Sequence, residues 1–237
     1  MKNNFKKCVT RLVAVMLAAA ISAGLLPCTL VYAQDKENPV YPYTIFAGSG
    51  DDGAITIKAD SFNVNGDIAT NGTIIASGNL NINGKKTEKA GEQMISAVKR
   101  LEAAYYSGNN VKDISGDFQK KDNNININNP MRVSGTLGLQ GNVSLNAAVI
   151  ADGDITISDG VLNCNSPLIC SRTGSITIEA GSAGLGGLIY APEGAVTLKS
   201  DNLNLNNIVI IADNVIISGR NVNAAYGRSA AAAITMA

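Results

Sequence analysis

The sequence contains no histidine and no tryptophan, and aromatic residues make up only 5% of its 237 positions. Without histidine there is no imidazole to activate a serine or cysteine nucleophile, and a common ligand of catalytic metals is missing. Few aromatic rings are present to stack against sugars. The composition therefore predicts no nucleophilic catalyst, no metal site and no cofactor.

Cysteine is also scarce, and two of the four residues, Cys8 and Cys28, lie in the leader described below. Cys164 and Cys170 remain. Export would permit a disulfide between them, and a corner at Ser166-Pro167 would bring their Cα atoms to the required distance of about 5.5 Å. The alternative, which the sequence favours, is that one or both are small core residues.

The first 33 residues differ from the rest of the chain. Basic residues between Lys2 and Arg11 precede an apolar stretch over 12–26, which is followed by Pro27 and a small-residue site ending at Ala33. This pattern predicts a helical signal peptide cleaved near Ala33, and hence a secreted or cell-surface protein. An uncleaved segment is the alternative, because about 20 apolar residues can span a bilayer. We expect contact with a membrane only through such an uncleaved segment.

Beyond Ala33 the chain carries 15 basic and 19 acidic residues. This net negative charge argues against a nucleic-acid partner. Most candidate acids stand at predicted corners, where Asp is favoured for bonding to nearby backbone. These are Asp51, Asp52, Asp152, Asp154, Asp159, Glu193, Asp201 and Asp213.

One module occurs four times: a glycine at 53, 153, 174 and 194 opens a short strand of the type Gly-Asp-Ile-Thr-Ile. The last three copies begin 21 and 20 residues apart, which is the length of one turn of a coiled β-structure. The sequence therefore predicts an all-β fold, a single-stranded parallel β-helix over 43–223. The rule for parallel crossovers predicts that it is right-handed.

The pleat of each copy predicts which side chains are buried, because alternate residues of a strand point to opposite sides. Two inward files are expected, one of Ile155, Ile176 and Val196 and the other of Ile157, Ile178 and Leu198. Thr156, Thr177 and Thr197 then form an outward ladder. A flat Thr rank is typical of ice-binding coils, but one rank over three coils is too short to favour that function.

Asparagines recur between apolar residues or at bends, at 63, 65, 79, 81, 83, 124, 126, 128, 202, 204, 206 and 207. Asn tolerates left-handed corners and can form a ladder with its copy in the next coil. We expect these structural roles, and sugar binding stays open as the alternative.

Several segments depart from the repeat. Residues 34–42 are polar and contain prolines, so we expect a linker. Residues 88–107 are expected to form an inserted amphipathic helix that covers the flank or end of the coil stack, and 109–124 a mobile loop. The helix stripe of Met94, Val98, Leu101 and Tyr105 is a candidate partner-docking face. Residues 224–237 are expected to be a cap or a frayed tail.

Residues 66–74 and 189–198 resemble the polymer-forming, bactofilin-like β-solenoids and related exported β-helical surface proteins of Gram-positive bacteria. The likeness covers 43–84 and 124–223. It implies a structural role and self-association through the coil ends. Bactofilins are cytosolic and lack a signal peptide, and this departure favours an envelope or extracellular role.

Together these patterns predict a non-enzymatic, exported structural or adhesive β-solenoid of the bacterial cell surface. The expected partners are a cell-wall or host glycan, or further copies of the chain. The alternative is a carbohydrate-binding or polysaccharide-degrading β-helix. That alternative requires several acids to converge in one groove with Arg132, Arg172 or Lys199.

Overall fold

The computed structural model describes residues 41–106, 110–165 and 168–235, so the predicted signal peptide and nearly all of the predicted linker lie outside the described residues. The described chain confirms the predicted parallel β-solenoid, which has about eight turns. Every strand pair is parallel. The first five strands in chain order are β1 (Tyr43–Ala47), β2 (Ile55–Asn65), β3 (Asp67–Thr70), β4 (Ile74–Asn83) and β5 (Lys86–Thr87).

The remaining elements begin with α2, a helix on the flank of the solenoid. In chain order they are α2 (Val98–Tyr106), β6 (Lys112–Ile114), β7 (Phe118–Ile127), β8 (Met131–Val133), β9 (Leu137–Leu145), β10 (Val149–Ala151), β11 (Ile155–Ser158), β12 (Val161–Cys164), β13 (Leu168–Ser171), β14 (Ile176–Glu179), β15 (Ser182–Lys199), β16 (Asn202–Tyr226) and α3 (Arg228–Thr235).

Each coil crosses three walls, which we name by their side chains. The Thr face consists of the strand segments in register with 176–179, and the Asn face of those in register with 202–206. The third wall, the covered face, contains β1, β3, β5, β6, β8, β10, β13 and the middle parts of β15 and β16.

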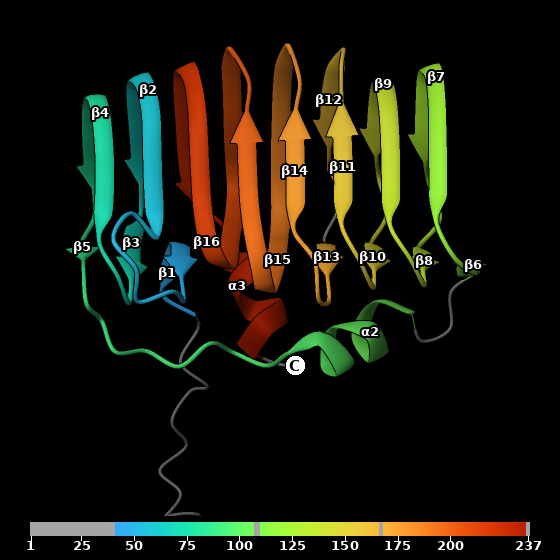
Figure 1. Ribbon diagram of the computed structural model, residues 1–237, viewed down its shortest axis with the longest axis horizontal. Helices are drawn as coiled ribbons and strands as arrows, with labels where there is room; N and C mark the ends of the chain where they lie inside the picture. Colours follow the sequence, from blue (N-terminus) through green and yellow to red (C-terminus); the bar gives the residue numbers. More distant parts are fainter. Residues whose placement is uncertain (1–40, 107–109, 166–167, 236–237) are drawn as a thin grey trace, which may run out of the picture. The chain divides into compact units, whose positions relative to one another are not determined.

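The order of the coils in space differs from their order in the sequence (Figure 1). Coils from β6 to β16 stack in chain order, but the next coil beyond β16 is built from β1 and β2, the first strands of the domain. The connection from β5 to β6, which includes α2, runs back along the covered face to the opposite end of the stack. The first strands therefore extend the stack beyond the last ones.

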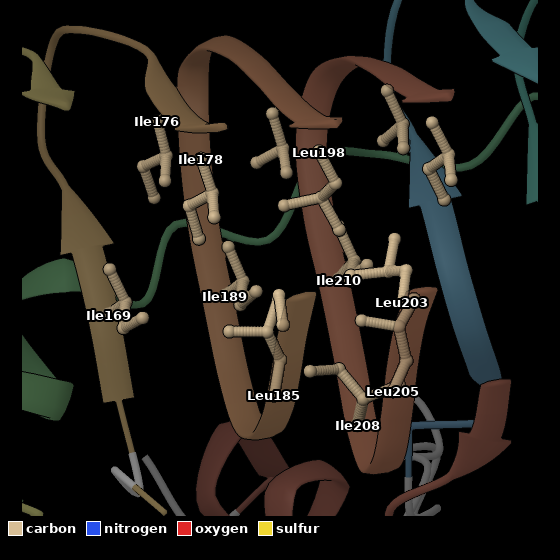
Figure 2. Packing of buried hydrophobic residues seen from close by; sticks show 14 of the residues in the cluster. Ile169, Ile176, Ile178, Leu185, Ile189, Leu198, Leu203, Leu205, Ile208 and Ile210 are labelled. Carbon is tan, nitrogen blue, oxygen red and sulfur yellow. The ribbon is translucent and has the colours of Figure 1, made fainter. Parts of the chain in front are cut away.

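Aliphatic side chains fill the interior in continuous files (Figure 2). Both predicted files are confirmed: Ile155 pairs with Ile176 and Ile176 with Val196, and the second file is in equivalent register. All six side chains are at most 1% exposed. Stacking like residues lets each coil share its apolar burial with its neighbours, which a single coil cannot do.

The covered face is apolar on both of its sides. Its outward side chains, among them Phe46, Ile150, Tyr190 and Ile211, form a second buried cluster with Ala97 and Leu101 of the helical segment and with residues of α3. Because this wall is shielded from solvent on both sides, its strands have nearly continuous apolar sequences, as in Ile208-Val-Ile-Ile211.

Three segment boundaries differ from expectation. The helix begins at Val98, not residue 88. At the start of the expected segment, Lys89 and Gly91 adopt φ values of +53° and +68° that a right-handed helix excludes. The expected loop over 109–124 instead contains β6 and most of β7. Its polar composition reflects its place as the terminal coil, which has solvent on one side. The tail forms α3, which packs on β15 and β16.

In the described chain no helix is long and apolar enough to cross a membrane.

Candidate binding face

The Asn face carries seventeen exposed asparagines over eight coils. Their side chains form three outward columns, because outward positions recur at every second residue of a strand. The middle column is representative: Asn81, Asn63, Asn223 and Asn204 follow one another from the β4 end. At about 4.8 Å per strand, eight coils give a face about 34 Å long.

Side-chain amides connect neighbouring coils along these columns. Asn146 Nδ2 donates to Asn128 Oδ1 at 2.9 Å and Asn83 Nδ2 to Asn65 Oδ1 at 3.1 Å. Three further bonds of 3.3 to 3.4 Å join Asn63 to Asn223, Asn81 to Asn63 and Asn221 to Asn202. In all five bonds the donor lies on the coil nearer β4. The predicted ladder of asparagines is therefore formed at nine of the seventeen positions.

The strand segments of the Asn face contain no Asp, Glu, Lys or Arg in any of the eight coils, all of which the structure describes. Charged residues gather instead at the corner between the Thr and Asn faces. There Lys199 Nζ lies 3.8 Å from Glu179 Oε1, and Arg220 Nη2 lies 3.5 Å from Asp201 Oδ2. The Asn face is thus polar and uncharged.

Sequence inspection missed six members of this face: Asn142, Asn146, Asn163, Asn165, Asn221 and Asn223. Each alternates with a buried residue, such as Val143, Cys164 or Val222. This period-two pattern in the sequence is the feature that could have identified them as outward-facing. Conversely, Asn207 is a corner residue with φ of +56°, which is the left-handed role expected for asparagine.

The Thr face contains the predicted Thr ladder in an extended form. Thr156, Thr177 and Thr197 are in register, and Ile216, Thr56 and Ile75 continue the same outward column. The neighbouring outward column holds Lys58, Lys199, Glu179 and Lys121. This wall is therefore charged along one side, unlike the Asn face.

Three corner acids bond to the backbone of an adjacent coil. Asp67 Oδ1 accepts the Lys85 N–H at 2.8 Å, and Asp117 and Asp154 accept those of Thr136 and Ser175 at 2.7 Å. The bond from Thr136 holds the pKa of Asp117 below its usual range. These carboxylates therefore connect coils, as structural side chains.

The other candidate acids have local partners, and two of them, Asp159 and Asp201, line one open hollow with Glu179 and Lys199. Asp51 accepts from Ser49, Asp52 from Thr73, Asp159 from Gln140 and Asp213 from Asn214, while Glu193 is exposed. In the described residues no group of three or more His, Cys, Asp or Glu side chains is arranged to hold a metal ion.

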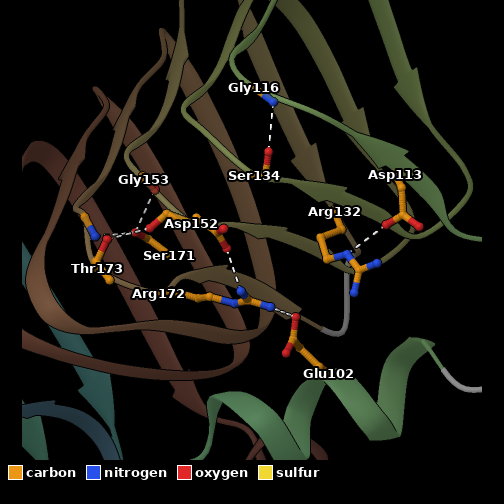
Figure 3. A network of polar contacts seen from close by, with 11 residues as sticks. Glu102, Asp113, Gly116, Arg132, Ser134, Asp152, Gly153, Ser171, Arg172 and Thr173 are labelled. Carbon is orange, nitrogen blue, oxygen red and sulfur yellow. Dashed lines mark hydrogen bonds and ion pairs between the residues drawn. The ribbon is translucent and has the colours of Figure 1, made fainter.

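One charged hollow of about 380 Å³ lies near the β6 end (Figure 3). It contains Arg132, whose Nε lies 2.8 Å from Asp113 Oδ1, and Arg172, whose Nη1 lies 2.7 Å from Asp152 Oδ1. Arg172 also pairs with Glu102 of α2. Each acid here is held by an arginine, and the pair with Glu102 fastens the helix to the solenoid.

The two cysteines belong to different apolar clusters. Cys164 faces the interior, whereas Cys170 lies in the outer cluster of the covered face with Ile150 and Tyr190. Both are buried thiols, so the disulfide considered from the sequence is not formed. Burial raises the pKa of the Cys170 thiol to about 12, with a smaller contribution from the charge of Asp152.

The predicted docking stripe faces the solenoid where the structure describes it. Leu101 is fully buried and Met94 packs against the same outer cluster, although Met94 precedes the helix. The side chains of Val98 and Tyr105 lie outside the described residues. Met94 and Leu101 therefore pack against the solenoid of the same chain and do not form a surface for a partner.

No protein-family model and no curated protein sequence matches the chain. Among solved structures, the crystal structure of an ice binding protein from an Antarctic biological consortium aligns with a TM-score of 0.46 and 13% sequence identity. The alignment covers 79% of this chain and 88% of that one. We draw no functional conclusion from a likeness of this size.

Proposed function

We propose that this protein is a non-enzymatic, exported adhesive module that attaches through its Asn face to a neutral, regularly repeating polymer, such as a cell-wall or host glycan. The observation that carries the proposal is the face itself: seventeen exposed amides in three columns, with no charged residue among its strand segments over eight coils.

Amide chemistry suits such a partner. An asparagine offers two N–H donors and a carbonyl acceptor, so it can bond to hydroxyl groups in either direction. Each ladder bond uses one donor of one amide and part of the acceptor capacity of its neighbour. The remaining capacity is available at the surface, on side chains already ordered by the ladder. Less conformational freedom is then lost on binding.

Adhesion across the face would be multivalent. A single exposed amide contributes little binding free energy, but a repeating partner engages many columns and coils at once. Regular spacing on the protein therefore favours a partner that is itself regular.

The bonding of the acids supports a role without catalysis. The three acids that share an open hollow with Lys199 each have a partner: Asp159 accepts from Gln140, Glu179 pairs with Lys199 and Asp201 pairs with Arg220. A glycosidase needs a carboxyl group whose pKa is raised so that it can act as a general acid. The pKa values of Glu88 and Asp117 are lowered, each by a backbone N–H bond from Ile74 or Thr136, which is opposite to the shift that a general acid needs.

The β7 end of the stack argues against filament growth by end-to-end stacking of coils. At the β7 end, Lys120 occupies the column whose neighbours Leu139 and Ile157 are buried, and Lys121 follows it. Stacking a second copy there would bury the charged amine of Lys120. Inward-pointing charges of this kind keep edge strands from pairing with another chain. Light scattering at high concentration is expected to report a monomer.

Export is part of the proposal and depends on the leader. Fractionation of the producing cells is expected to place the protein in the medium or envelope, with Gln34 as its first residue. Retention in the cytoplasm with an intact leader would contradict this part of the proposal.

The adhesive function can be tested by retention of the purified protein on insoluble neutral polysaccharide particles. Because the face is uncharged, retention is expected to persist at about 1 M salt, where electrostatic attraction is screened beyond about 3 Å. Asn63→Asp removes the two N–H donors of this amide and introduces a charge. It should weaken retention roughly tenfold, near the upper end of the range for one net hydrogen bond. Thr177→Asp, on the Thr face, is the matched control. Absence of retention, or equal loss in both variants, would refute the proposal.

A further inference from the structure

The middle column of the Asn face is interrupted at two places by small residues. Gly184 of β15 lies between Asn163 and Asn204, and Ser144 of β9 lies between Asn126 and Asn163. Large polar side chains thus alternate with small ones over five consecutive coils. The interruptions hollow the face on either side of Asn163.

Both hollows are lined mainly by asparagines and main chain. The one at Gly184 has a volume of about 250 Å³, and its lining includes Asn163, Asn165, Asn204, Asn206 and Gly186. The one at Ser144 has a volume of about 270 Å³, and its lining includes Asn124, Asn126, Asn142, Val161 and Asn163. Asn163 is common to both.

The hollow at Gly184 exists because a side chain is missing, not because the backbone requires glycine there. The backbone of Gly184 avoids the left-handed region, and nothing lies within 4 Å of the position that a Cβ would occupy. Any residue is therefore sterically permitted at 184, and an asparagine would complete the column.

The two hollows lie about 10 Å apart, because two strand spacings of about 4.8 Å separate β9 from β15 on this face. Both hollows are small, so each is suited to a compact group and not to a bulky protein segment. A ligand that enters both must present two such groups at this interval. A linear polymer does so.

We infer that the hollows at Gly184 and Ser144 are paired subsites for one chain of a neutral, polyhydroxylated polymer, that is, a linear uncharged glycan, with the Asn163 amide bonding to units on both sides. This inference rests on the proposed adhesive function and names its ligand class and contact point. The rest of the Asn face then supplies further contacts along the same polymer.

Filling the hollows tests the inference without removing any amide. Gly184→Asn and Ser144→Asn add asparagine to the existing column. Thr197→Asn places the same side chain on the Thr face of the same strand, β15, where it lines neither hollow. Thermal melting of all three variants should match or exceed that of the wild-type protein. This result would show that changes in binding are not caused by unfolding.

The measurement is calorimetric titration with linear oligosaccharides of glucose and of N-acetylglucosamine, with particle retention measured in parallel. We expect an oligosaccharide long enough to span both hollows to bind roughly tenfold or more weakly to each filled variant. Binding should be lost in the double variant and unchanged in Thr197→Asn.

The opposite result distinguishes the two proposals. If Gly184→Asn and Ser144→Asn bind the oligosaccharides and the particles as tightly as the wild-type protein, or more tightly, a continuous amide column is sufficient. The paired subsites would then be wrong while the adhesive function stands. If the wild-type protein binds neither oligosaccharides nor particles, both proposals fail.

Discussion

Ile45 of β1 lies in direct register with Ile210 of β16, although the two residues come from opposite ends of the folded domain. Both are fully buried. This contact joins the N-terminal coils to the C-terminal coils, and the stack cannot be completed until the chain has returned along its whole length. Such non-local closure is expected to make folding slow and cooperative.

The junction makes a specific prediction about stability. Ile210→Ala removes buried volume between the two blocks and should lower the free energy of unfolding by about 2–5 kcal/mol. Hydrogen exchange should show that coils on both sides of β16 become less protected together. Ile216→Ala, whose side chain is 37% exposed on the Thr face, should change stability by no more than about 0.5 kcal/mol. Full protection of 43–87 in the Ile210 variant would contradict the account.

The returning segment is held by Tyr190. Its hydroxyl accepts the Ala97 N–H at 3.1 Å and donates to the Ile95 carbonyl. Tyr190→Phe leaves both buried groups without this partner and should cost about 1–3 kcal/mol, with faster exchange of the Ala97 amide. Tyr43→Phe loses only an exposed bond to Glu92 and is the control. Equal effects of the two substitutions would argue against this anchoring role.

Stability should fall in acid. The folded pKa values of Glu88 and Asp117 are lowered, chiefly by the backbone bonds from Ile74 and Thr136, so the ionised forms are favoured in the native state. Their contribution is present above about pH 4, the range of free carboxyl groups, and is lost as the pH falls through the lowered native values. Denaturation of Glu88→Gln and Asp117→Asn should therefore show a flatter pH dependence, with lower stability at neutral pH. An unchanged slope in both variants would be inconsistent with these bonds.

The cysteines should be unreactive in the native state. Cys170 is buried and its pKa is raised to about 12, so almost no thiolate exists at neutral pH. A thiol reagent should modify Cys164 and Cys170 only after denaturation, as followed by mass spectrometry. An intramolecular bridge in the native mass would instead support the disulfide.

The interior could be predicted from the sequence where the repeat is strong. The repeats of the type Gly-Asp-Ile-Thr-Ile predict the burial of Ile155, Ile176 and Val196, because the pleat of a strand separates inward-pointing from outward-pointing side chains. The start of the helix was not predictable from its apolar stripe, because the stripe begins at Met94, before the first helical residue, Val98.

The arrangement of the faces was harder to predict, because it depends on the order of the coils. Thr56 lies only two coils from Thr197, with Ile216 between them, yet no sequence periodicity relates residue 56 to residue 197. The same permuted order brings Asn63 beside Asn223. Local repeats identify the columns, but only tertiary contacts join their two halves into one face.

The most direct test of the adhesive face is nuclear magnetic resonance of the asparagine side-chain amides during titration with a linear neutral oligosaccharide. The account predicts shifts confined to the Asn face and largest at Asn163, Asn165 and Asn204, with little change in the Arg172 guanidinium signal. Shifts centred on Arg172 and Arg132, or none at any asparagine of the face, would contradict it.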